Sequence, residues 1–232
     1  MNGLLTAAYD FQSFGDTREW KSCIVGGIAV QRWGEPRVTR DVDMFIFTSI
    51  GGEEDYITCL LGHYQTRIKD PESFARKNRV LLLQTRDKVS IDVSLGALPF
   101  EDLVVQRATT FEFTPGLSLR TCSAEDLIVM KLFASRVLDI HDAETVAIRH
   151  RETLDWPYIE RQLGPLAELK GGEPILQTLD RLRRGIYHSR VAGAPLDRTQ
   201  PTAPPSANKA QAYTTGTKSL PVRPPRSSNP RD

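Results

Sequence analysis

Two stretches in the first half of the chain space their apolar residues as β-strands do. In residues 41–45, two acids alternate with apolar side chains, which predicts a strand with one polar edge. Residues 80–95 combine an apolar run (80–84), a polar turn (85–88) and an alternating run (89–95). This combination predicts a β-hairpin.

Helical spacing dominates the second half. Ser123, followed by two acids, predicts a helix start, and four apolar residues at helical spacing should bury against the sheet: Leu127, Met130, Ala134 and Val137. Asp155 is the expected cap of a helix reaching Leu163, with Pro157 in its first turn. Another helix is predicted over 174–188, with one apolar face: Ile175, Leu176, Leu179, Leu182 and Ile186. These last two helices should form a cap over one side of the sheet.

Asp41 and Asp43 are the candidate metal ligands of the first strand. Side chains two residues apart lie on one face of a strand, so both carboxylates should stand together while Val42 and Phe45 point into the core. Two such charges repel each other, and a bound Mg²⁺ would satisfy them because it prefers carboxylate oxygens. Similar pairs are common on exposed strands, so the alternative is that both acids merely line the solvent side of a half-buried strand. The neighbouring residues decide between metal binding and this alternative.

The residues before the acid pair favour phosphate binding. Gly26 and Gly27 form a turn that lets backbone amides approach a phosphate, and the helix expected after them has an N-terminus that favours anions. Arg37 and Thr39 are placed to contact phosphate or carboxylate, since a guanidinium binds either in a forked geometry. Arg40 is expected to be a surface or ion-pair residue.

From residue 20 to residue 147 the chain resembles the nucleotidyltransferase superfamily, which has the polymerase-beta-like fold. It is most similar to the AbiEii and AbiGii toxin-like group, in which Gly-Gly precedes an Arg-x-Thr-x-Asp-x-Asp block, here Arg37 to Asp43. The resemblance implies an α/β (α+β) fold, with a small mixed β-sheet flanked by helices. It places a catalytic domain at 1–150 and a C-terminal helical cap at 151–190.

The resemblance also implies roles for later residues. The family takes its third metal-binding carboxylate from a strand such as Ile91-Asp92-Val93, so Asp92 would join the first two acids. Lys131 would hold the nucleotide's phosphates. The family's Lys-x-x-Ala-x-x-Arg pattern is matched by Lys131, Ala134 and Arg136, with one residue's difference in spacing.

Asp139 and Asp142 occupy the place where relatives have two close acids opening the next helix. On an unbroken helix both would share a face with Lys131. They can pair with Arg136 or Lys131, cap the helix, or act as a base. A structural or positioning role is favoured because ion pairing or capping explains them. His141 is expected to be incidental.

Composition limits the class of protein. The 232 residues are 40% hydrophobic and 25% charged with a net charge of +1, which is ordinary for a soluble domain and predicts no general affinity for nucleic acid or membrane. The apolar runs are too short to span a bilayer and the first residues lack a basic region, so a cytoplasmic location is expected. Three unpaired cysteines and scattered histidines favour neither disulfides nor a zinc site.

Residues 191–232 change to Pro, Ala, Ser, Thr and Gln with few large apolar groups. Such a segment cannot bury enough surface to order itself, so a disordered tail is predicted. Residues 201–232 contain five Lys or Arg residues and one acid, and this positive charge could help to hold an RNA acceptor. A flexible, dispensable extension is the favoured interpretation.

The leading hypothesis is a nucleotidyltransferase dependent on Mg²⁺ or Mn²⁺, which moves a nucleoside monophosphate from a nucleoside triphosphate to an acceptor hydroxyl. The toxin resemblance implies tRNA or protein as the acceptor and a cognate antitoxin as a partner. Other members of the superfamily modify aminoglycoside or lincosamide antibiotics, so a small-molecule acceptor is an alternative. A non-catalytic nucleotide-binding interaction module is the alternative from another class.

Overall fold

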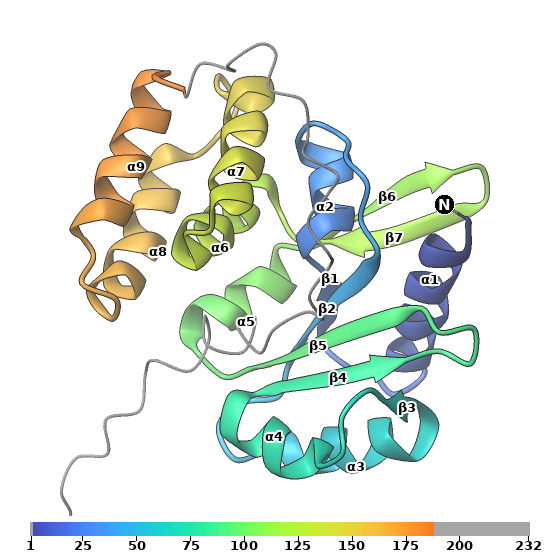
Figure 1. The fold of residues 1–232 in the computed structure, drawn as a ribbon. Helices are drawn as coiled ribbons and strands as arrows, with labels where there is room; N and C mark the ends of the chain where they lie inside the picture. The colour runs from blue at the N-terminus through green and yellow to red at the C-terminus, as the bar shows by residue number, and fades with distance from the viewer. Residues whose placement is uncertain (1, 188–232) are drawn as a thin grey trace, which may run out of the picture.

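A seven-stranded mixed sheet forms the centre of the computed structural model, which describes residues 2–187 (Figure 1). The strand order is β3-β4-β5-β2-β1-β7-β6. The expected hairpin is present as the antiparallel pair β4 and β5, and β2 lies parallel to β5. The bounds of the strands are β1 (Ser22–Ile24), β2 (Asp41–Phe47), β3 (Gln65–Thr66), β4 (Val80–Gln84), β5 (Ser90–Gly96), β6 (Thr109–Thr114) and β7 (Leu117–Thr121).

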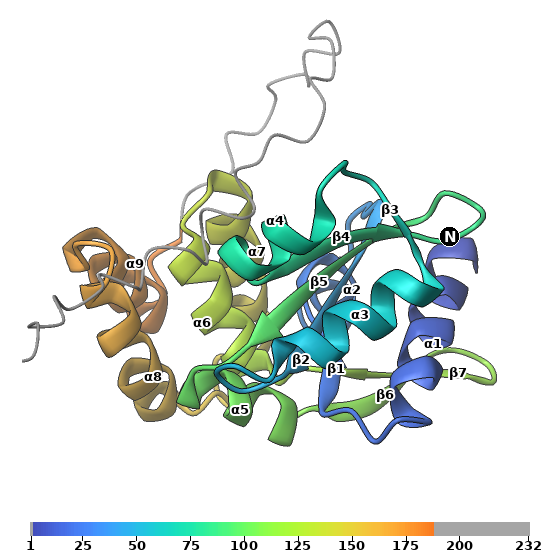
Figure 2. The ribbon, with the colours of Figure 1, turned by 90° about the horizontal axis from the view of Figure 1, so that it is seen from below.

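The described helices cover both faces of this sheet. Their bounds are α1 (Asn2–Asp16), α2 (Gly26–Trp33), α3 (Glu53–His63), α4 (Pro71–Asn78), α5 (Pro99–Gln106), α6 (Ala124–Ala134), α7 (Val137–His150), α8 (Trp156–Glu168) and α9 (Glu173–Arg184). Apolar residues of α1 and α3 pack with one face, whereas α5 and α6 pack with the other. Figure 2 shows α1 and α3 along the strands, with α6 to α9 gathered to one side. None of the helices within residues 2–187 is long and apolar enough to cross a membrane.

Strand β2 divides its residues between the two faces. Val42 and Met44 are buried among the apolar residues under α1 and α3, as expected for Val42. Asp41 and Asp43 lie on the opposite face. Phe45 is buried as expected, but it shares the face of the acids rather than that of Val42 and packs with the apolar residues of α5. This face is therefore polar where β2 begins and apolar where it ends.

The helix predicted from Ser123 is interrupted. Ser123 caps α6 as expected, but α6 ends at Ala134, Ser135 takes a left-handed conformation with φ of 58°, and α7 begins at Val137. Val137 is 88% exposed, which contradicts its predicted burial. An unbroken helix carrying Lys131 and the two later acids is also excluded, because the chain turns between them.

The C-terminal helices form as predicted but differ in their ends and contacts. Asp155 caps α8, which continues beyond Leu163 to Glu168. Helix α9 stops at Arg184 because Gly185 takes a left-handed conformation, so Ile186 lies outside the helix and is 54% exposed. Helix α8 packs chiefly on α6, and α9 packs on α8, α6 and α7, rather than on the strands. The tail predicted over 191–232 lies outside the described residues.

Candidate active site

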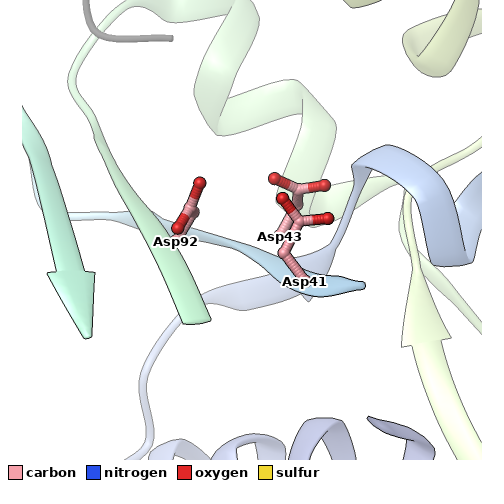
Figure 3. Close-up of side chains that lie close together, drawn as sticks. All are labelled: Asp41, Asp43 and Asp92. Atoms are coloured by element: carbon pink, nitrogen blue, oxygen red, sulfur yellow. The ribbon is translucent and has the colours of Figure 1, made fainter. Parts of the chain in front are cut away.

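Three carboxylates meet on the polar half of the sheet face (Figure 3). Asp41 and Asp43 project from β2, and Asp92 projects from β5, where it is the direct cross-strand neighbour of Asp43. One oxygen from each carboxylate lies within 4.8 Å of the others. Parallel pairing in this register places the two strands' acids on the same face. The structure thus brings together the three acids singled out in the sequence.

The chemistry of this cluster suits a divalent cation. All three donors are carboxylate oxygens, and Asp92 is buried while Asp41 and Asp43 are partly buried. Oxygen donors in this number suit Mg²⁺ or Mn²⁺, which usually take only part of their ligands from the protein and the rest from water or phosphate. The residues present therefore fit the metal that the family implies.

Gly26 and Gly27 begin α2 directly beside the acids. Gly26 has a φ of 60°, and a side chain on it would overlap the Asp43 carboxylate. A side chain on Gly27 would overlap Thr39, and the Gly27 amide donates a hydrogen bond of 3.4 Å to Asp43. Only glycine allows this approach at both positions. The helix begins two residues earlier than expected, and its N-terminus faces a carboxylate.

Thr39 and Arg40 both lie in the loop before β2, where Thr39 is half-buried and Arg40 is exposed. The Thr39 hydroxyl donates a hydrogen bond of 3.2 Å to the Asp41 carboxylate. This bond orients one of the three acids. Arg40 is exposed, as expected for a surface residue.

Five charged residues form a continuous ion-paired chain at one side of the acids. Lys131 Nζ lies 2.9 Å from Asp139 Oδ1 and 2.7 Å from Asp142 Oδ2. Arg37 binds Asp142 through a fork of two 2.8 Å hydrogen bonds, and Arg136 pairs with Asp139. In the order Arg37, Asp142, Lys131, Asp139 and Arg136, positive and negative charges alternate. This chain, which we call the cation chain, has one excess positive charge and joins the loop before β2 to α6 and α7.

Asp142, a buried acid of the cation chain, is held in its charged form. Burial raises the pKa of Asp142, but the hydrogen bonds from Arg37 and the charge of Lys131 outweigh it and lower that pKa below its ordinary value. The same hydrogen bonds raise the pKa of Arg37. Because both acids are engaged by cations, their geometry is that of positioning residues for Lys131, Arg37 and Arg136.

A pocket of about 300 Å³ contains the acids, the glycines and most of the cation chain. Ser94 and Met130 line this pocket and also a second one of about 330 Å³. The second pocket lies among α4, β5, α5, α6 and α8. It is mainly apolar, with lining residues that include Phe45, Phe100, Phe133, Leu166 and Leu169, and it is also lined by the charged residues Arg76, Lys77, Arg79 and Glu101. The charged site therefore adjoins an apolar pocket of similar size.

Sequence reasoning missed Arg67, whose guanidinium pairs with Asp92. No motif surrounds Arg67, and it is 25 residues from its partner. The only usable signal was strand register, since Arg67 follows β3 opposite Leu82 of β4. Sequence reasoning also missed the apolar pocket, because that pocket is built from five separate parts of the chain.

Comparison with known proteins gives a family match and remote similarities to solved structures. Residues 23–180 match the family described as "Nucleotidyl transferase AbiEii toxin, Type IV TA system". A crystal structure of an antigenic nucleotidyltransferase-like protein from Paracoccidioides brasiliensis is similar at 17% identity and a TM-score of 0.46, covering 76% of this chain and 92% of that one. The solution structure of the antibiotic-resistance factor ANT(2'')-Ia is similar at 17% identity and a TM-score of 0.38, covering 79% and 90%.

The comparison with curated proteins gave no match. The two structural similarities are too remote to assign a substrate. The family match stands by itself, because it spans more than half of the chain and includes the acids, the glycines and the cation chain. The chain therefore belongs to the AbiEii family of nucleotidyltransferase toxins.

Proposed function

We propose that this protein is a metal-dependent enzyme that transfers a nucleoside monophosphate from a nucleoside triphosphate to an acceptor hydroxyl. The observation that carries the proposal is the cluster of three carboxylates beside the cation chain in one pocket. Acids that bind a divalent cation and basic residues that bind phosphate are the two requirements of nucleotidyl transfer. The cytoplasm, where nucleoside triphosphates are abundant, is the proposed location.

Each group of residues has a distinct role in this proposal. Asp41, Asp43 and Asp92 would hold Mg²⁺ or Mn²⁺, which supplies positive charge to the triphosphate when bound. Lys131, with Arg37 and Arg136 beside it in the cation chain, would neutralise the phosphates. The amides at the start of α2 would donate hydrogen bonds to phosphate oxygens.

The proposed reaction is a displacement at the α-phosphorus. The acceptor oxygen forms a bond to this phosphorus, the bond to the bridging oxygen breaks, and pyrophosphate leaves. Asp92 is the proposed base for the hydroxyl proton, because Ser94, two residues further along the same strand face, already lines the second pocket. A hydroxyl entering from that pocket would meet Asp92 before Asp41.

The apolar pocket among α5, α6 and α8 is the proposed acceptor site. Its position next to the acids and its aromatic lining suit a hydroxyl-bearing group with a flat or apolar portion. Because the family is one of toxins, we propose a cellular RNA, such as tRNA, or a protein as the acceptor, and an antitoxin as the partner. A small-molecule acceptor such as an antibiotic is the outcome that would replace this assignment.

A labelling experiment tests the proposed transfer. The wild type and an Asp41→Asn, Asp43→Asn double variant would be incubated with each α-labelled nucleoside triphosphate, Mg²⁺ and a cell extract, which is then separated into RNA, protein and small molecules. We expect label in the RNA or protein fraction with the wild type and at least a 100-fold loss in the double variant, on the order of the effect of removing charge-stabilising groups. Asp87→Asn, in the exposed turn between β4 and β5, is the matched control.

The outcomes separate the candidate functions. Label in the small-molecule fraction alone would identify a small-molecule acceptor, such as an antibiotic. Nucleotide binding without label in any fraction, under conditions where both proteins remain folded, would contradict transfer and favour a non-catalytic binding module.

A further inference from the structure

Arg67 belongs to a row of residues that crosses the sheet. Its backbone amide donates a 2.9 Å hydrogen bond to Leu82, continuing the register of β3 with β4. Leu82 is the cross-strand neighbour of Asp92, which is in turn the neighbour of Asp43. Cross-strand neighbours project to one face, so the Arg67 side chain passes over Leu82 toward the acids. The fold therefore delivers a guanidinium to the cluster from the edge opposite to Gly26.

The guanidinium pairs with Asp92 itself. Arg67 Nη2 contacts Asp92 Oδ1, and the two side chains are only 21% and 10% exposed. Asp92 Oδ1 belongs to one of the three carboxylates whose oxygens converge within 4.8 Å. Clustered carboxylates repel one another, and this repulsion is reduced by a nearby cation of either the protein or the solvent. Arg67 thus supplies part of the charge compensation that a metal ion would provide.

Arg67 holds its acid through fewer hydrogen bonds than Arg37 does. Arg37 holds Asp142 through a fork that uses two nitrogens. Arg67 contacts Asp92 through one nitrogen, and its buried Nε has no hydrogen-bond acceptor among the described residues. A forked pair resists separation because two bonds must break together. The Arg67 pair lacks that restraint, so this contact opens more readily than the fork between Arg37 and Asp142.

We infer that Arg67 competes with the divalent cation for Asp92. In the metal-free protein it stabilises the acid cluster, and it must give up Asp92 before that carboxylate can bind a metal ion. Arg67 therefore weakens binding of the free ion. A triphosphate adds anionic ligands, so the site would load metal chiefly together with nucleotide. This inference rests on the proposed function, because it requires Asp92 to be a metal ligand.

Direct measurement of Mn²⁺ binding tests the competition without any need for an acceptor. Free Mn²⁺ would be titrated by electron paramagnetic resonance into the wild type, Arg67→Gln and Arg67→Lys, without nucleotide. We expect Arg67→Gln to bind Mn²⁺ about tenfold more tightly, the size of effect typical of groups that contact a metal ligand. Arg67→Lys keeps the positive charge and should stay within about threefold of the wild type. Arg18→Gln removes one charge in the exposed turn after α1 and should leave the affinity unchanged.

Protein stability provides a second readout. Without metal, Arg67→Gln should unfold at a lower temperature than the wild type, and saturating Mn²⁺ should raise its unfolding temperature by more than it raises that of the wild type. If Arg67→Gln does not fold, Arg67→Met, which keeps a long side chain without charge, serves for both measurements. Equal or weaker Mn²⁺ binding by the uncharged variant would overturn the inference.

The inference and the proposed function fail in different ways. Equal binding of Mn²⁺ by the wild type and Arg67→Gln, with loss of binding in Asp41→Asn, would remove only the competition by Arg67. Absence of Mn²⁺ binding in all of the folded proteins would remove the metal site and the inference together.

Discussion

Asp142 shows how single residues organise the site. It is 1% exposed, yet it carries a charge because Arg37 and Lys131 both contact it. Removing one partner from a buried ion pair leaves the other charge uncompensated. Asp142 lies outside the lining of the acidic pocket, while Lys131 and Arg37 lie within it. We therefore propose that Asp142 serves function by placing these cations, and its contribution to stability depends on pH.

We expect Asp142→Asn to lower the free energy of unfolding by about 3 kcal/mol at neutral pH. Because the folded protein holds the pKa of Asp142 below its ordinary 3.8, the ion pairs contribute fully above that value and are lost as pH falls through the lower, folded pKa. The difference between wild type and variant should therefore shrink below about pH 4. Urea unfolding at several pH values measures it, with exposed Asp87→Asn as control. If the difference in the free energy of unfolding did not change with pH, the stabilisation could not be assigned to the charged form of Asp142.

At the scale of elements, the buried carboxylate of Asp126 joins three helices. It accepts hydrogen bonds of 2.7 Å from Ser123 and 2.6 Å from the Tyr158 hydroxyl of α8. Arg107, which follows α5, lies 3.3 Å away. Burial and the neighbouring Asp126 raise the pKa of Tyr158, so its hydroxyl remains a donor at neutral pH. These bonds set the spacing of α5, α6 and α8, which together line the apolar pocket.

Tyr158→Phe should lower the free energy of unfolding by about 2 kcal/mol, since a buried charged acceptor loses one of its donors. Chemical denaturation measures the change. Tyr9→Phe is the matched control, because Tyr9 is an exposed tyrosine of α1 and should give a change close to zero. Equal stability of the two variants would contradict a stabilising hydrogen bond between Tyr158 of α8 and Asp126.

At the scale of the whole molecule, one apolar cluster connects the sheet to the C-terminal helices. It runs from Cys23 and Phe45 in the strands through Leu127 of α6 to Leu163 of α8 and Leu179 of α9. A continuous core of this kind favours cooperative unfolding of the parts that share it. The catalytic domain predicted at 1–150 and the cap predicted at 151–190 are therefore expected to unfold together.

Leu163→Ala tests this cooperativity, because Leu163 is completely buried in α8. We expect the free energy of unfolding to fall by about 3 kcal/mol. Hydrogen exchange should show the same loss of protection in β2 as in α8. Ile148→Ala, at an exposed position of α7, is the control. Loss of protection confined to α8 and α9 would contradict a shared core and support a separate cap.

Much of the local structure was predictable because it depends on neighbouring residues in the chain. The side-chain period of two in a strand placed Asp41 and Asp43 on one face, and side-chain caps marked the starts of α6 and α8 at Ser123 and Asp155. The need for glycine at Gly26 also follows from local backbone conformation. The acid pair and its glycine turn could therefore be found without any knowledge of the fold.

Only the tertiary structure decided which distant groups meet. Strand register set Asp43 beside Asp92 and carried Arg67 across Leu82, and register depends on pairing between separate segments. The break at Ser135 placed Lys131 between acids of the next helix and left Val137 in solvent, although helical spacing had suggested burial. The sequence by itself determined the residue types of the candidate site and their local geometry. Packing between elements determined their charge partners, because ion pairs form between side chains that folding brings together.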